Sequence, residues 1–202
     1  MRTHNVAVIG GDGIGPDVTA AAVAAMRAAA DRFGFTLSTN DFDLGAARYR
    51  RTGVALDDST VEQLRGHDAI LLGAIGDPDV APGILERGVV LALRVALAQS
   101  VNIRPVRLYP GVQSPVRGIT PQRCDMVILR ENTEGLYAGG GALVHEGGDN
   151  AVALQQSVTT AGATRSIVDV AFRLAAARRG RLALCHKSNV LTYAGRLWDE
   201  VV

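Results

Sequence analysis

Apolar and polar positions follow two alternating periods along the first hundred residues, and this alternation predicts βαβ units. Apolar runs typical of strands occupy residues 5–10 (NVAVIG), 35–42 (FTLSTNDF) and 69–76 (AILLGAIG). Helical spacing is found at residues 16–32, 59–65 and 85–99. Strands that alternate with amphipathic helices indicate a doubly wound α/β arrangement.

The pattern changes from about residue 101. Four further strands are expected at residues 102–110, 124–132, 142–146 and 151–160, and the sequence GGDN between the last two is typical of a hairpin turn. Later elements are a helix over 160–179, a strand over 181–187 and the start of a helix from 188. We therefore expect two domains, residues 1–100 and 101–202. The hairpin is either an arm that completes a sheet across a dimer interface or an ordinary surface hairpin.

The glycine-rich stretch GGDGIGPDV, residues 10–18, directly follows the first strand. A dinucleotide-binding fingerprint needs glycine at three positions, and Gly11 and Gly13 fit two of them, but the third is Pro16. The acidic residue expected to hold a ribose hydroxyl comes later than the fingerprint requires, at Asp41. A conventional Rossmann fold is disfavoured, and a turn that only connects strand to helix remains an alternative.

Composition narrows the range of functions. A chain of 202 residues with 48% hydrophobic content can bury a core in one or two domains. A net charge of +1 argues against nucleic acid or an anionic membrane as partner. The longest apolar stretch is interrupted by Arg94, no secretory leader is evident, and the two cysteines form no disulfide framework. We expect a soluble, cytoplasmic protein.

Candidate chemistry concentrates on five side chains. Arg94 lies in an apolar helix, Arg104 precedes a proline, and Arg130 ends a strand. These three residues either make ordinary ion pairs or converge on a substrate with two carboxylates, which guanidinium groups bind bidentately. Tyr137 is either a core residue or an acid presented to a cleft. Lys187, at the predicted carboxyl end of a strand, is either solvated or a base with a lowered pKa.

Two basic features have structural explanations. Arg178 and Arg179 are expected in the last turn of the helix over 160–179, with Gly180 as its C-terminal cap, where cations complement the helix dipole. His186 is expected on the opposite face of its strand from Lys187 and is not assigned a catalytic role.

Five blocks of sequence, taken together and in order, carry a family resemblance. They are GDGIGP, LLGAIGDP, LALR followed by NIRPVRLYPG, LRENTEGLYAG, and HKSNVL. With these blocks the chain resembles, over essentially its whole length, the β-decarboxylating dehydrogenases, the family of isopropylmalate, isocitrate and tartrate dehydrogenases. The resemblance implies an α/β two-domain sandwich that is not a conventional Rossmann fold, with an antiparallel dimerisation arm.

The resemblance also implies roles for individual residues. Substrate-binding roles fall on Arg94, Arg104, Arg130, Val90, Leu91 and Val190. Cofactor-binding roles fall on Ile14, Gly73, Gly76 and Asn189. Tyr137 matches the tyrosine that donates a proton after decarboxylation, and Lys187 matches the lysine that helps to remove the hydroxyl proton. The implied cofactors are NAD, with NADP left open, and Mg²⁺ or Mn²⁺. The implied assembly is a homodimer in which the lysine serves the neighbouring subunit's site.

The implied reaction is oxidation of a 2-hydroxy dicarboxylic acid followed by loss of CO₂, with the metal ion stabilising the ketone and the enolate. Isocitrate enzymes of the family place a serine and an asparagine where this chain has Gly88 and Val90. An apolar pocket favours 3-isopropylmalate, which would yield 2-oxoisocaproate in leucine biosynthesis. Arg87 keeps a tartrate-like or isocitrate-type substrate open, and a non-catalytic regulatory subunit is the alternative from another class.

One departure from the family concerns the metal ligands. The family's metal-binding aspartates lie beyond the lysine block, and none of the acidic residues of this chain can be assigned to them by motif. We therefore expect a fragment or a shortened product that lacks the C-terminal part, has no metal ligands and is not active alone. We also expect an N-terminal sheet that lacks strands.

Overall fold

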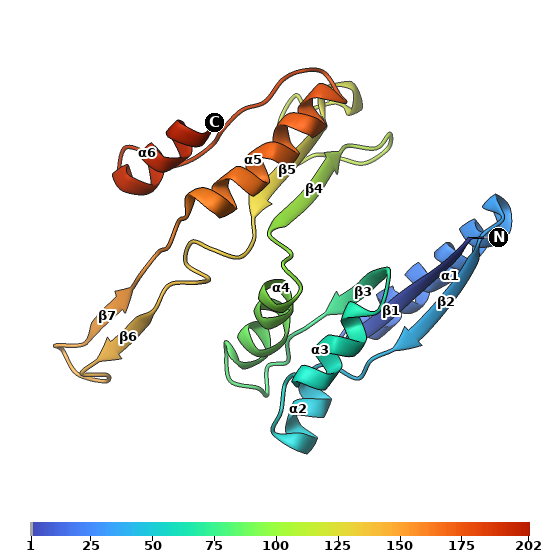
Figure 1. Ribbon diagram of the computed structural model, residues 1–202, viewed down its shortest axis with the longest axis horizontal. Coiled ribbons are helices and arrows are strands. Elements are labelled where there is room, and N and C mark those ends of the chain that lie inside the picture. The colour runs from blue at the N-terminus through green and yellow to red at the C-terminus, as the bar shows by residue number, and fades with distance from the viewer. Residues whose placement is uncertain (1) are drawn as a thin grey trace. The chain divides into compact units, whose positions relative to one another are not determined.

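The computed structural model describes residues 2–202 and divides the chain into two compact units. The N-terminal unit extends to Leu97, and the C-terminal unit begins at Ala98 (Figure 1). Each unit has its own sheet and its own helices. No helix within residues 2–202 is long and apolar enough to cross a membrane.

A parallel three-stranded sheet forms the centre of the N-terminal unit. Strands β1 (Thr3–Gly11), β2 (Thr36–Asp41) and β3 (Ala69–Ala74) lie in the order β2-β1-β3. The central strand β1 is buried from Val6 to Ile9, as its unbroken apolar run predicts for a strand covered on both faces. The predicted strands and their parallel pairing are confirmed.

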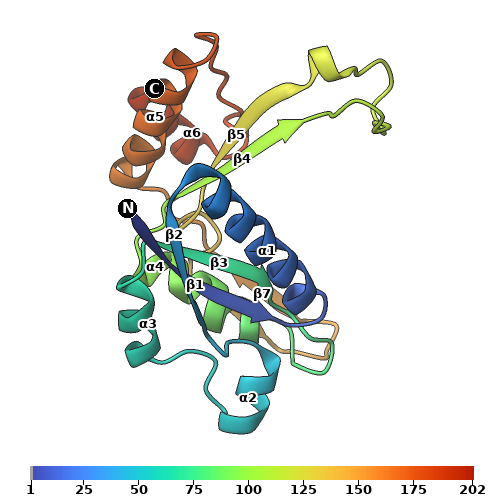
Figure 2. The ribbon, with the colours of Figure 1, turned by 90° about the vertical axis from the view of Figure 1, so that its right-hand side faces the viewer.

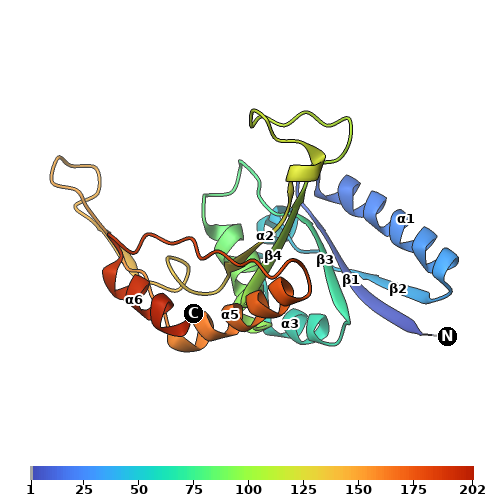
Figure 3. The same cartoon turned by 90° about the horizontal axis from the view of Figure 1, so that it is seen from above.

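Helices cover both faces of this sheet. Helix α1 (Gly15–Phe33) begins with a proline in its first turn, ends at a left-handed glycine and packs against all three strands. On the other face, the core joins Ala7 and Ile9 of β1 to residues of α3 (Asp58–Arg65) and of the 85–97 segment: Val61, Leu64, Val89 and Leu93. Figures 2 and 3 show α1 and α3 on opposite sides of β1.

Two features of the N-terminal unit differ from the expectation. The helix expected over 85–99 is divided into a π-helix, η1 (Glu86–Leu91), and a short α-helix, α4 (Ala92–Ala96). It ends early because Ala98 adopts a left-handed φ of 52°, which interrupts the helix. Helix α2 (Ala46–Thr52), between Gly45 and Gly53, is too short and too rich in arginine to show a clear apolar period.

The C-terminal unit is built from two antiparallel ribbons and two helices. Strand β4 (Val101–Arg107) pairs with β5 (Asp125–Glu131), which is preceded by a short 3-10 turn, η2 (Pro121–Arg123). Strands β6 (Gly141–Val144) and β7 (Val152–Gln155) form the predicted hairpin. Helix α5 (Ala161–Ala176) packs against β5 and against α6 (Thr192–Val201). The hairpin extends beyond the first turn of α5 (Figures 1 and 3).

The prediction of a strand over residues 181–187 is wrong. These residues form no regular structure and are all exposed. A strand needs a backbone partner, and β5 is paired only with β4 within residues 2–202. A groove of about 1240 Å³ is lined by β5 on one side and by residues 181–186 on the other, so the two segments lie apart rather than hydrogen-bonded.

The end of α5 also differs in detail. The helix stops at Ala176, so Arg178 and Arg179 lie beyond its last turn. Both guanidinium groups bind Asp125 at the start of β5, with nitrogen to oxygen distances of 2.9 and 3.1 Å. Gly180 has the left-handed φ of 65° expected of a capping glycine, and its N–H donates to the carbonyl of Ala175. The predicted capping glycine is confirmed, whereas the predicted placement of the two arginines in the last helical turn is wrong, because both pair with Asp125 beyond the helix.

Candidate functional site

Two of the predicted substrate-binding arginines share one face of the β4–β5 ribbon. Asn102 of β4 lies directly opposite Arg130 of β5, and Arg104 is two residues along β4 from Asn102. Side chains that are paired across two antiparallel strands, or that lie two apart on one strand, point to the same face. The ribbon therefore presents Arg104 and Arg130 on the same side.

A buried asparagine joins the two guanidinium groups. The Oδ1 atom of Asn132 accepts a hydrogen bond from Arg130 Nη2 at 2.8 Å and a longer one from Asn102 Nδ2 at 3.3 Å. The Oδ1 atom of Asn102 in turn accepts from Arg104 Nε at 2.9 Å. Asn132 is only 5% exposed, and its own Nδ2 donates to the carbonyl of Gln99 at 3.1 Å.

Tyr137 lies beside this pair. The Cζ atom of Arg130 is 5.6 Å from the centroid of the Tyr137 ring, within the range of a cation–π contact. The Tyr137 side chain is 47% exposed, so its ring also faces solvent. The structure thus brings together the predicted acid and one of the predicted carboxylate-binding residues.

The loop that carries Tyr137 is held at two points by carboxylates. The Glu131 carboxylate accepts the backbone N–H groups of Thr133 and Glu134 at 2.9 and 2.7 Å. The Glu134 carboxylate accepts both the N–H and the hydroxyl of Thr160, each at 2.7 Å, where Thr160 is the N-cap of α5. These contacts fix the loop between the end of β5 and the start of α5.

The electrostatics of this face favour an anion. The Nε atom of Arg130 is buried and has no hydrogen-bond partner within residues 2–202. A buried cationic donor without an acceptor is costly, and a carboxylate oxygen is its strongest natural acceptor. Arg104, Arg130 and Tyr137 all line the groove of about 1240 Å³.

Three predicted residues of the C-terminal unit lie elsewhere. Lys187 is exposed, and its carbonyl accepts the N–H of Leu191 at 2.8 Å. Asn189 and Val190 lie in the turn after it, and Val190 is 65% exposed. None of these three side chains lines the groove that contains Arg130.

Three of the four predicted cofactor residues, Ile14, Gly73 and Gly76, lie at or next to the carboxyl ends of β1 and β3. Open parallel sheets commonly bind ligands at the carboxyl ends of their strands. Ile14 at the start of α1 is 66% exposed, and Gly76 has a φ of 147°, a conformation that favours glycine. A Cβ atom on Gly73 would come within 2.3 Å of the Gly10 carbonyl oxygen, so Gly73 allows β3 to pack closely on the glycine turn. A Cβ atom on Gly13 would meet no other atom within 4 Å, so the glycine turn is open at that point.

Asp12 organises this edge and was not identified from the sequence. It is 9% exposed, and its carboxylate accepts the N–H of Ala46 at 2.8 Å and that of Gly76 at 3.0 Å. One side chain therefore holds the start of α2 and the loop after β3 against the turn after β1. The available signal was an acidic residue between two glycines directly after a buried strand.

The remaining predicted residues, Val90, Leu91 and Arg94, lie on η1 and α4 and are half-buried. A Cβ atom on Gly88 would approach Ala55 Cβ to 2.9 Å, which is too close without a shift. The position where isocitrate enzymes place a serine is therefore closed to a larger side chain.

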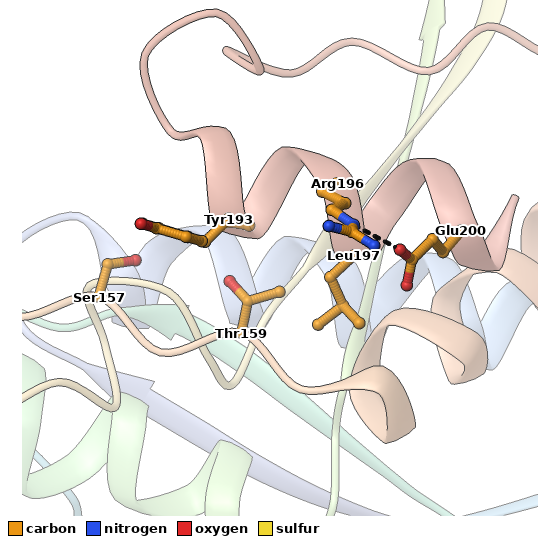
Figure 4. Close-up of a pocket in the computed structure, with 7 residues that line it drawn as sticks. Ser157, Thr159, Tyr193, Arg196, Leu197 and Glu200 are labelled. Carbon is orange, nitrogen blue, oxygen red and sulfur yellow. Dashed lines mark hydrogen bonds and ion pairs between the residues drawn. The ribbon is translucent and has the colours of Figure 1, made fainter.

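Other features do not form a second candidate site. No group of three or more His, Cys, Asp or Glu side chains within residues 2–202 is arranged to hold a metal ion. A pocket of about 400 Å³ between α6 and the linker after β7 contains Ser157, Thr159 and Tyr193 (Figure 4). The cation that lines it, Arg196, donates to Glu200 at 2.7 Å, and none of the predicted site residues lines it.

Three aspartates, Asp57, Asp77 and Asp125, have lowered pKa values. The N–H of Asp79, followed by the side chain of Arg50, lowers the pKa of Asp77. Hydrogen bonds from Ser59 and from the N–H and hydroxyl of Thr60, with Arg48, hold the pKa of Asp57 well below its usual range. The side chain of Arg178, followed by that of Arg179, lowers the pKa of Asp125. Asp57 and Asp125 fix helix ends and lie outside the candidate site.

Comparison with known proteins identifies the class to which this α/β fold belongs, the β-decarboxylating dehydrogenases. Isocitrate dehydrogenase from Methylococcus capsulatus superimposes with a TM-score of 0.79 and 31% identity, covering 98% of this chain and 55% of that one. A β-decarboxylating dehydrogenase from Thermococcus kodakarensis gives a TM-score of 0.67 and 31% identity, covering 98% of this chain and 54% of that one.

The family follows from the sequence match. The isocitrate/isopropylmalate dehydrogenase family model matches residues 5–202, and the chain belongs to that family. The 3-isopropylmalate dehydrogenase of Thermobifida fusca is 51% identical over 202 residues, which are 100% of this chain and 57% of that protein. The 3-isopropylmalate dehydrogenase of Mycobacterium tuberculosis is 51% identical over 197 residues, 98% of this chain and 57% of that protein. The chain thus spans little more than half the length of these relatives.

Proposed function

We propose that this chain takes part in the NAD-dependent oxidative decarboxylation of 3-isopropylmalate to 2-oxoisocaproate, a step of leucine biosynthesis. The observation that carries the proposal is the arrangement of Arg104, Arg130 and Tyr137 around one groove of the C-terminal unit. Two cations and an adjacent phenol suit a substrate that has two carboxylates and needs a proton late in the reaction. The names of the relatives from Thermobifida fusca and Mycobacterium tuberculosis support the choice of substrate.

In the proposed mechanism, Arg94, Arg104 and Arg130 hold the carboxylates of the malate moiety. Lys187 takes the proton of the 2-hydroxyl group as the hydride leaves the same carbon. NAD, when bound, supplies the hydride acceptor. After the β-carboxylate departs as CO₂, the Tyr137 hydroxyl donates a proton to the resulting carbanion. The described residues build no metal site, so no step is assigned here to a metal ion.

Specificity for an apolar substituent is assigned to Val90, Leu91 and Val190. A third carboxylate placed against such side chains would lose its hydration without gaining donors, and this costs more than the roughly 2–7 kcal/mol of an uncompensated neutral polar group. The closed position at Gly88 removes the alternative of a hydroxyl donor there. Isocitrate, which has a third carboxylate, and tartrate, which has a hydroxyl group in place of the isopropyl group, are therefore expected to bind less well than 3-isopropylmalate.

The cofactor edge of the N-terminal unit is assigned to Ile14, Gly73 and Gly76, and Asn189 keeps the cofactor-binding role that the family resemblance implies. Ile14 offers an exposed apolar surface at a helix start, and the N–H groups of that helix end favour an anionic cofactor group. We propose NAD as the cofactor because the family resemblance implies it, and NADP is the alternative. The free thiols of Cys124 and Cys185 suit a reducing compartment, and the cytoplasm is the proposed location.

The proposed partner is a second copy of this chain, joined through the β6–β7 hairpin. The register places Ala142 opposite Leu154 and Val144 opposite Val152, so one face of the hairpin is apolar. Leu154 is 57% exposed and Val152 is 48% exposed. Exposed apolar surface of this kind marks an interface. In a dimer, Lys187 and Val190 of one copy would serve the site of the other.

Binding of the acid tests the function directly. Isothermal titration of the chain with 3-isopropylmalate, isocitrate and tartrate should give the highest affinity for 3-isopropylmalate, and Arg130→Met should weaken that binding by at least about thirtyfold, because an ion pair is lost. Arg123→Met is the matched control, since Arg123 only donates to the Gly118 carbonyl. Equal affinity of Arg130→Met and Arg123→Met for 3-isopropylmalate would contradict the proposal. A higher affinity of the parent chain for isocitrate than for 3-isopropylmalate would also contradict it.

A further inference from the structure

The two arginines of the β4–β5 face are not independent of each other. Arg130 bonds to Asn132 directly, and Arg104 is connected to the same Asn132 oxygen through Asn102. Asn132 is thus the point at which the hydrogen bonds of both guanidinium groups meet. Removing the Asn132 side chain would free the Arg130 guanidinium group and the Asn102 amide that carries Arg104.

Asn132 is itself held rigidly. Its backbone N–H donates to the carbonyl of Ser100 at 2.9 Å and its Nδ2 donates to that of Gln99 at 3.1 Å, both just before β4. With 5% exposure, its amide has little access to water. Its Oδ1 therefore keeps a fixed position from which it can orient the two neighbouring donors.

The orientation of Arg130 leaves its Nε donor available for a ligand. With Nη2 bound to Asn132 and Cζ held 5.6 Å from the Tyr137 ring, the guanidinium plane is fixed on two sides. Its buried Nε has no acceptor within residues 2–202. A bidentate carboxylate complex needs the guanidinium plane set before the ligand arrives, since ordering it afterwards costs affinity.

On this basis, and resting on the proposed function, we propose that Asn132 is a positioning residue for the dicarboxylate. It sets the orientation of Arg130 directly and that of Arg104 through Asn102. It contacts neither the substrate nor the cofactor. Its role is to preorganise the two cations so that binding both carboxylates requires no rearrangement.

Side-chain NMR of the arginines tests this without any need for turnover. In the parent chain, restricted rotation about the Cζ–Nε bond should give Arg130 separate Nη resonances, whereas Asn132→Leu should average them. Asn132→Asp is the matched control, because it also loses the donor to Gln99 but keeps the acceptor for Arg130. Separate resonances should therefore persist in Asn132→Asp, with slower rotation because the acceptor is charged. This expectation can be tested even if Asn132→Leu fails to fold.

Titration with malate provides the second readout. Asn132→Leu should lower the affinity for malate by about tenfold, and Asn132→Asp should lower it less, because misplaced binding groups lose the benefit of preorganisation. Unchanged Arg130 resonances and unchanged malate affinity in Asn132→Leu would overturn the inference. Averaged resonances in Asn132→Leu, with no malate binding even in the parent chain, would instead overturn the proposed function and leave Asn132 as the anchor of Arg130.

Discussion

The two units of this chain differ in what holds them together. In the N-terminal unit, one cluster of buried apolar residues lies between β1 and the helices on one side of the sheet, and a second joins Ala46 of α2 to Val80 and Leu85. In the C-terminal unit, the buried apolar residues are Ile167 and Val168, both on α5. There the elements are connected mainly by polar contacts: Asp125 with Arg178, Glu134 with Thr160, and Asn132 with its neighbours.

The two units therefore illustrate two different means of holding elements together. Apolar burial contributes about 25 cal/mol per Å² and does not depend on direction, so it stabilises a unit without orienting particular groups. Hydrogen bonds to charged groups contribute less in net stability but fix the geometry of specific atoms. The candidate carboxylate-binding site lies in the C-terminal unit, where hydrogen bonds to charged groups connect the elements.

The largest expected effect is in the core of the N-terminal unit. Leu64 is 1% exposed, and Leu64→Ala should lower the free energy of unfolding by about 2–5 kcal/mol. Leu184→Ala is the control, because Leu184 is 39% exposed in the irregular 181–187 segment and its truncation should cost less than about 0.5 kcal/mol. Urea unfolding followed by circular dichroism measures both. A large loss in Leu184→Ala would mean that 181–187 is packed as a strand after all.

The second largest expected effect is the loss of stability when the Asp12 carboxylate is removed. Asp12→Ala removes the acceptor of two backbone N–H groups in a buried position and should destabilise the N-terminal unit by about 2–4 kcal/mol. The single tryptophan, Trp198, lies in α6 of the C-terminal unit, so its fluorescence reports on the other unit. We expect an earlier transition by circular dichroism and an unchanged one by fluorescence. Coincident shifts in both signals would show that the two units unfold together.

A smaller effect is expected at the glycine turn. Gly73→Ala places a Cβ atom 2.3 Å from a backbone oxygen and should cost about 1–3 kcal/mol through displacement of the strand. Gly13→Ala meets no atom within 4 Å, and only its left-handed φ of 54° is unfavourable, at about 1 kcal/mol. Thermal unfolding of the two variants separates close packing from backbone strain. Equal losses would contradict the packing role assigned to Gly73.

The smallest expected effect is the loss of stability at low pH. The lowered pKa values of Asp57 and Asp125 mean that each contributes stability above its ordinary pKa and loses it as the pH falls through the folded value. For aspartate this places the loss below about pH 4. Asp125→Asn should reduce the acid sensitivity of the Trp198 signal, and Asp57→Asn that of the circular dichroism signal. An acid titration of both signals provides the test.

The N-terminal unit was largely predictable because burial and local pattern agree there. Residues Val6 to Ile9 form an unbroken apolar run that is a buried strand, and the proline and glycine at the ends of α1 mark its bounds. The 181–187 segment has the same kind of pattern but forms no strand. Apolar sequence encodes a tendency to pair, whereas pairing itself depends on a partner that only the tertiary structure supplies.

The charged residues of the candidate site could be predicted from the sequence, but the hydrogen bonds that connect them could not. Arg104, Arg130 and Tyr137 were identified from unusual settings in the sequence, and the structure gathers them at one groove. Asn132 and Asp12 were missed because neutral amides and single acids are common after strands. Their importance comes from hydrogen bonds to residues about 30 or more positions away, which no local spacing encodes.

The wide turn of η1 changes how distances along the sequence translate into directions around the helix. The N–H of Ala92 donates to the carbonyl of Arg87, five residues earlier, so one more residue fits into this turn than an α-helix allows. Counting back from Arg94 therefore does not give the angular position that an α-helix of about 3.6 residues per turn would give. Redesign of substrate preference in this segment should treat the length of the turn as a variable, because deleting one residue would rotate every side chain before it relative to Arg94.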